Sequence, residues 1–128
     1  MLTSVPENPN DVASRIQAVI DANQEARRAM RASEVVLKRA LRSLERTGSV
    51  PETLKGMPAV VDRPSVKEPL EKYVESRHEL RLAVIARCLD EGMSIGEVGR
   101  QYGFSRQLAS RYAKEVRERT QAETRSEP

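Results

Sequence analysis

The stretch from Val12 to Arg46 contains neither proline nor glycine, and this constrains the fold more than any other feature of the chain. Asn10 or Asp11 can cap the start of a helix there, and Gly48 can end it. We therefore predict one helix over residues 10–47. At ~1.5 Å per residue it would reach ~55 Å, which is too long for an ordinary globular helix without a partner along its length.

Apolar and small residues recur along this helix at alternating steps of four and three, which is the spacing of a coiled-coil seam. The seam consists of Val12, Ile16, Val19, Asn23, Ala26, Met30, Ser33, Leu37, Ala40 and Leu44. Its small members would let a facing helix approach closely, and the polar Asn23 would fix the register. The flanking positions carry charges that suit solvated edges and ion pairs between helices: Arg15, Asp21, Glu25, Arg27, Arg28, Arg31, Glu34, Arg39, Arg42 and Glu45.

We predict that this seam joins two copies of the chain, with residues 10–47 as a dimerisation arm. The residues expected to carry the homodimer are Val12, Ile16, Val19, Asn23, Met30, Leu37 and Leu44. The alternative is that the helix folds back on a later helix of its own chain. A kink near Asn23 or Ser33 is compatible with either arrangement.

The segment that follows is dense in helix breakers, with four prolines and two glycines between Gly48 and Pro69. It excludes a long helix, so we predict that residues 48–65 form a connector. Within it, Ser49 as a cap and Pro51 in the first turn favour one short helical turn.

Apolar residues at helical spacing predict a second long helix from about Val66 to Glu91, closed by Gly92. Residues 66–119 together are expected to form one small domain. The two ends of the chain, residues 1–9 and 120–128, are polar, and we expect both to be disordered. The whole pattern is that of an all-α protein.

The composition excludes several classes of function. The 22 basic residues are opposed by 19 acidic ones, so only a local excess of positive charge can attract phosphate. The single Cys and single His leave no ligand set for a metal and no Cys/His pair for catalysis, and we predict no enzyme activity and no cofactor. No apolar run reaches the ~18 residues of a membrane span, and we expect a cytoplasmic protein.

The stretch from Ser94 to Tyr112 predicts two short helices joined by a tight corner. Ser94 can cap a helix over residues 95–102, and Gly103 permits the positive φ that a sharp turn demands. Ser105 can cap the next helix, over residues 106–119. There Leu108, Ala109 and Tyr112 would face inward, and Arg106, Gln107, Ser110 and Arg111 would face outward.

The segment "SIGEVGRQYGFSRQLASRY" resembles the helix-turn-helix of bacterial DNA-binding regulators, particularly the "VA..aGVSxxTVSR" form of lactose-repressor-type and resolvase-type domains. The matching residues are Val98, Gly99, Gly103, Phe104, Ser105, Gln107, Ser110 and Arg111. Gly99 stands where such domains usually have Ala, and Leu108-Ala109 stands where they usually have a polar residue followed by Val or Ile. The second departure leaves Gln107 and Leu108 as alternatives for the residue at the bases.

The resemblance implies that the second helix enters the major groove of double-stranded DNA in a nucleoid-associated transcriptional regulator. Six basic residues against two acidic ones between Arg100 and Arg119 agree with it. The DNA-binding residues that we predict are Ser105, Arg106, Gln107, Ser110, Arg111 and Lys114. Arg106 and Gln107 would contact bases, Ser105, Ser110 and Lys114 phosphates, and Arg111 either.

Two other functions fit the same sequence. One is a coiled-coil adaptor whose long helix binds a protein partner such as a polymerase or a toxin. The other is a DNA-binding accessory subunit of a phage or mobile element.

Overall fold

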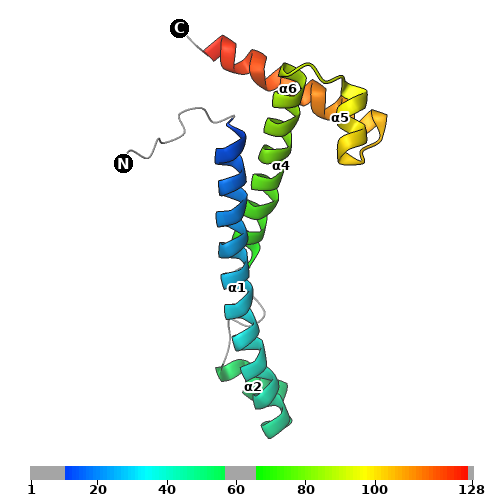
Figure 1. The fold of residues 1–128 in the computed structure, drawn as a ribbon. Helices are drawn as coiled ribbons and strands as arrows, with labels where there is room; N and C mark the ends of the chain where they lie inside the picture. The colour runs from blue at the N-terminus through cyan, green and yellow to red at the C-terminus, as the bar shows by residue number, and fades with distance from the viewer. Residues whose placement is uncertain (1–10, 57–65, 127–128) are drawn as a thin grey trace. The chain divides into compact units, whose positions relative to one another are not determined.

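The computed structural model describes residues 11–56 and 66–126, and all of its regular structure there is helical. The helices are α1 (Val12–Thr47), α2 (Val50–Gly56), α4 (Lys67–Asp90), α5 (Ile95–Tyr102) and α6 (Arg106–Ser126) (Figure 1). The predicted all-α class and the long N-terminal helix are confirmed. None of these helices combines the length and the apolarity that a membrane span requires.

The ends of α1 lie where the sequence places them. The Asp11 carboxylate accepts a hydrogen bond from the Ala13 backbone at 3.2 Å, which caps the first turn. At the other end Gly48 has a φ of 65°, and its N–H donates to the Leu44 carbonyl at 2.7 Å. This left-handed residue closes the helix, because an L side chain rarely adopts that conformation.

The short helical turn predicted within the connector is present as α2, which has seven residues. The Ser49 hydroxyl accepts a hydrogen bond from the Glu52 backbone at 3.3 Å and so caps α2. The remainder of the predicted connector after Gly56 lies outside the described residues, as does the N-terminal segment 1–9 that we expect to be disordered.

The last helix is longer than expected. We predicted its end near Arg119 and a disordered tail from residue 120, whereas α6 continues to Ser126. The physical reason is that nothing between Arg106 and Ser126 breaks a helix, since the next proline is Pro128. The lack of apolar residues after Arg119 therefore does not mark the end of the helix. Residues 127 and 128 lie outside the described part.

The chain divides into two compact units, and both long helices contribute to each of them. Within the described residues, the first unit contains residues 11–18 and 76–126. Its core is formed by Leu82, Ala83 and Ile85 of α4, Val98 of α5, and Ala109 and Ala113 of α6, all of them buried. Small residues on α6 allow its backbone to approach the other helices closely.

The second unit extends over residues 19–75, and its described residues, 19–56 and 66–75, include few buried side chains. Ala22 and Ala26 of α1 and Thr53 of α2 are buried in it. Large apolar side chains remain exposed instead: Met30, Val35, Leu37, Leu41, Leu44, Val50, Leu54, Leu70 and Val74.

The surroundings of the predicted seam differ from one part of α1 to another. In the first unit, Arg15 pairs with Glu79 of α4, so the first turns of α1 lie beside another helix of the same chain. Further along, the seam residues Met30 and Leu37 are 52% and 51% exposed. Ile16, on those first turns, is itself 45% exposed, so seam residues are exposed in both units.

Candidate nucleic-acid interface

Helix α5 is fixed at both ends by hydrogen bonds that its sequence supplies. The Ser94 hydroxyl accepts from the Glu97 backbone at 3.1 Å, and the Glu97 carboxylate accepts from the Ser94 backbone at 3.0 Å. This capping box holds the pKa of Glu97 below its usual value. At the other end Gly103 has a φ of 76°, as predicted, and the Phe104 N–H donates to the Gly99 carbonyl at 2.8 Å.

Gly99 of α5 lies close against Ala109 of α6. A Cβ atom added to it would lie 3.2 Å from the Ala109 Cβ and 3.5 Å from the Phe104 carbonyl oxygen. A side chain at this position would therefore have scarcely room for its first methyl group.

The start of α6 is set by Ser105, whose hydroxyl accepts a hydrogen bond from the Leu108 backbone at 3.1 Å. The cap confirms the predicted beginning of the helix. It also gives the hydroxyl oxygen a partner inside the chain. Any phosphate bound at this end would therefore be held mainly by free N–H groups of the first turn.

A cluster of rings fills the corner between α4, α5 and α6. Phe104 stacks on Tyr102 at a centroid distance of 4.7 Å and lies 5.4 Å from the Tyr112 ring. Arg81 of α4 lies over the Tyr112 ring, 5.2 Å from its centroid, and its guanidinium donates a hydrogen bond to the Tyr112 hydroxyl at 3.2 Å. These contacts join the turn to α4.

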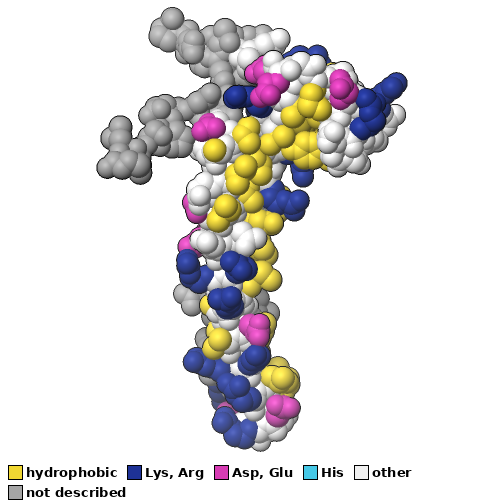
Figure 2. All heavy atoms as spheres, in the orientation of Figure 1, with side chains coloured by type: hydrophobic (Ala, Val, Ile, Leu, Met, Phe, Trp, Pro, Cys, Tyr) yellow, Lys and Arg dark blue, Asp and Glu magenta, His cyan; other side chains and the backbone are white. Residues whose placement is uncertain are grey.

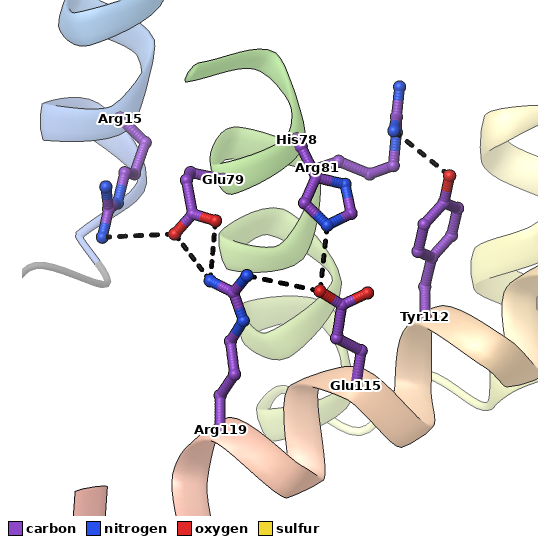
Figure 3. Close-up of polar contacts among 7 residues, drawn as sticks. All are labelled: Arg15, His78, Glu79, Arg81, Tyr112, Glu115 and Arg119. Carbon is purple, nitrogen blue, oxygen red and sulfur yellow. Dashed lines mark hydrogen bonds and ion pairs between the residues drawn. The ribbon is translucent and has the colours of Figure 1, made fainter. Parts of the chain in front are cut away.

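A polar network further along joins α6 to α4 (Figure 3). His78 Nε2 lies 2.9 Å from a carboxylate oxygen of Glu115, and Arg119 binds both carboxylate oxygens of Glu79 at 2.7 and 2.6 Å. Arg119 also reaches Glu115 at 3.3 Å. Sequence reasoning missed this network because its partners are far apart in the chain and no local spacing marks them.

The network changes the distribution of charge on α6. Arg119 and Glu115 are directed toward α4, and Lys114 lies 3.9 Å from Glu118. Arg106, Arg111 and Arg117 make no ion pair among the described residues. The uncompensated positive charge of α6 therefore lies at Arg106 and Arg111 on its first turns and at Arg117 further along.

The predicted contact residues share one exposed face of α6. Ser105 precedes the helix, and Arg106, Gln107, Ser110, Arg111 and Lys114 are all exposed on it. At about 100° per residue, the five helical positions fall within an arc of about 140°. Gln107 is exposed and Leu108 is half-buried, so Gln107 is the one whose side chain reaches solvent. Figure 2 shows Lys and Arg side chains where α5 and α6 meet.

An open groove of about 710 Å³ lies beside the second half of α6 and was not foreseen from the sequence. Ala86 and Leu89 of α4, Ile95 of α5 and Val116 of α6 are among the residues that line it. Arg106 and Arg111 do not line it, so the groove and the exposed basic face are separate features. In the described parts of the chain no group of His, Cys, Asp or Glu is arranged to hold a metal ion.

Comparison of the chain with protein-family models, with curated proteins and with solved structures finds no match.

The packing at Gly99 can be tested within one helix. Gly99→Val should lower the free energy of unfolding by about 1–3 kcal/mol, because the added methyl groups would force α5 from Ala109. Gly96→Ala is the control, since its Cβ would lie 3.6 Å from the flexible end of Arg100 and 3.9 Å from the Ser94 hydroxyl oxygen, both ordinary van der Waals distances. That change should raise the free energy of unfolding by up to about 1 kcal/mol through helix propensity. Urea unfolding of both variants measures the difference, and equal effects would disprove the close contact.

The link between α4 and α6 should depend on pH. The hydrogen bond from His78 is the largest cause that lowers the pKa of Glu115 in the folded chain, below its ordinary value of 4.5. A carboxylate with a lowered pKa stabilises the fold above that ordinary value and loses this effect as pH falls through the lowered pKa. Glu115→Gln should therefore lower the free energy of unfolding by about 0.2–1 kcal/mol at neutral pH and by almost nothing in strong acid.

Urea unfolding from pH 7 into acid measures the difference between the Glu115→Gln variant and the native chain. Glu118→Gln is the control, because Glu118 is exposed on the same helix and its ion pair is with Lys114 at 3.9 Å. A Glu115→Gln cost that stays constant with pH would show that the effect is packing and not charge.

Proposed function

We propose that the chain is a transcriptional regulator that binds double-stranded DNA in a sequence-specific manner, with α5 and α6 as a helix-turn-helix and α6 as the recognition helix. The observation that carries this proposal is the exposed face of α6, on which Gln107 stands beside Arg106 and Arg111, two arginines that make no ion pair with any described residue. In such motifs the N-terminal residues of the second helix contact base edges in the major groove.

The side chains of this face divide by their chemistry. Arg106 suits the paired acceptors of guanine, and Gln107 suits the donor and acceptor of adenine. Ser110 and Lys114 suit phosphate oxygens, and Arg111 can serve either. Ser105 contributes as the cap that leaves the helix N-terminus open to an anion.

We further propose that the protein acts as a homodimer joined through α1. One recognition helix offers few contacts, whereas two about 34 Å apart bind a palindromic site with useful affinity. Met30, Leu37, Leu41 and Leu44 supply an exposed apolar row for the second copy. A protein adaptor would use the same row, and the oligomeric state separates the two functions.

The proposed contact of α6 with the major groove of DNA predicts a specific loss of binding affinity. After duplexes are selected from a random library with the native chain, Arg106→Ala with Gln107→Ala should cost about 1–3 kcal/mol per lost base contact and relax the preference at those positions. The measurement is titration of selected and scrambled duplexes. Arg87→Ala with Gln121→Ala is the matched control, because both side chains are exposed, Arg87 on α4 and Gln121 about four turns beyond Arg106 on α6. Unchanged preference in the first variant would refute the assignment.

The dimer is tested by sedimentation equilibrium. Leu37→Asp with Leu44→Asp should convert dimers to monomers, because it places two charges on the proposed apolar contact. Val35→Asp should leave the dimer intact, since Val35 is 50% exposed on another side of α1. A native chain that is already monomeric at the concentrations used for DNA binding would rule out this arm as the dimer contact.

A further inference from the structure

Seven basic side chains share one face of α1, and all of them are exposed. At about 100° per residue they fall within an arc of about 120°. They are Arg27, Arg28, Arg31, Lys38, Arg39, Arg42 and Arg46, and we refer to them as the α1 stripe. Figure 2 shows Lys and Arg side chains gathered along this part of α1.

Little negative charge opposes the α1 stripe. Between Arg27 and Arg46 only Glu34 and Glu45 are acidic, and they stand at or beyond the edge of the arc. Arg28 pairs with Glu25, and Lys38 pairs with Glu34 at 2.9 Å, both within the helix. The other five arginines make no ion pair in the described part of the chain.

We propose that the α1 stripe binds the phosphate backbone of double-stranded DNA, as a contact surface separate from α6. The stripe extends over ~29 Å at ~1.5 Å per residue. Duplex DNA carries one negative charge per ~1.7 Å of its axis, so a rod of this length can meet several phosphates. Six of its seven members are arginines, whose planar forks match phosphate oxygens better than an ammonium does.

A lipid surface is the other anionic partner that a basic helix can have, and the apolar side of α1 argues against it. A helix that lies on a membrane inserts a continuous apolar face. On α1 that side includes Ala22 and Ala26, which are already buried in the chain, and the polar Asn23 and Ser33. The exposed apolar side chains of α1 do not form one continuous face, because Val35 and Leu37 point to different sides of the helix at ~100° per residue and these polar and buried positions lie between Ile16 and Leu37.

The same arrangement keeps the α1 stripe available in a dimer. Leu37 lies about 140° around the helix from the middle of the stripe at ~100° per residue. Two copies joined through the apolar row would leave both stripes facing solvent. The inference shares its partner with the proposed function but none of its residues, so the two can fail separately.

The test uses the full chain and a duplex of random sequence. In Arg31/Arg39/Arg42/Arg46→Gln, the slope of the logarithm of the affinity against the logarithm of the salt concentration should become shallower by about 3–4, at ~0.9 per phosphate contact. Lys55/Lys67/Lys72/Arg87→Gln removes the same charge elsewhere and should leave most of the slope intact. Arg→Lys at the four stripe positions should also keep it. Equal loss in the stripe and control variants would overturn the proposal.

A second measurement leaves the positive charges of α1 in place. A photo-cross-linking residue at Val35 should attach to the duplex, and one at Leu37 should not, although the two side chains are 50% and 51% exposed. Cross-links from Leu37 alone, or binding of the stripe to anionic phospholipid vesicles without binding to DNA, would overturn the proposal. Loss of sequence preference with the slope intact implicates α6; loss of slope with preference intact implicates the stripe.

Discussion

The close contact of α5 with α6 at Gly99 is the constraint on which the candidate interface depends. Helix α5 spans only Ile95–Tyr102, and a helix of that length is not stable in water alone. Three features fix its position on α6: the capping box, the left-handed Gly103, and the lack of a side chain at Gly99, where a Cβ would lie 3.2 Å from the Ala109 Cβ. Because Ala109 and Ala113 are then buried, the opposite face of α6, which begins with Arg106, is left in solvent.

The network between α4 and α6 sets the orientation of that face more than it stabilises the fold. Ion pairs at this level of exposure contribute ~0–1 kcal/mol each. Arg119, however, joins two carboxylates, since its Nη1 donates to both oxygens of Glu79 and its Nη2 donates to Glu115. This arrangement also directs the charge of Arg119 toward α4. The positive field of α6 is thereby concentrated at its N-terminal turns, where a helix end already favours anions.

The sequence predicted those features that local spacing determines. The caps of α1, α5 and α6, the turn at Gly103 and the exposure of Arg106, Gln107, Ser110 and Arg111 follow from residues within a few positions of one another. The contacts of His78 with Glu115 and of Arg81 with Tyr112 could not be predicted, because they depend on how α4 and α6 cross. The end of α6 was misplaced because falling hydrophobicity was taken as the end of helical structure.

The formal charge of +3 conceals two local concentrations of arginine that have different surroundings. On α6, Arg106 stands beside Gln107 and Ser110, whose hydrogen-bonding groups can discriminate between bases. On the α1 stripe the neighbours are further arginines, which attract phosphates of any sequence. A protein with both kinds of surface would gain most of its affinity from one and most of its selectivity from the other. The two contributions differ in their response to salt, since counterion release scales with the number of phosphate contacts and not with base recognition.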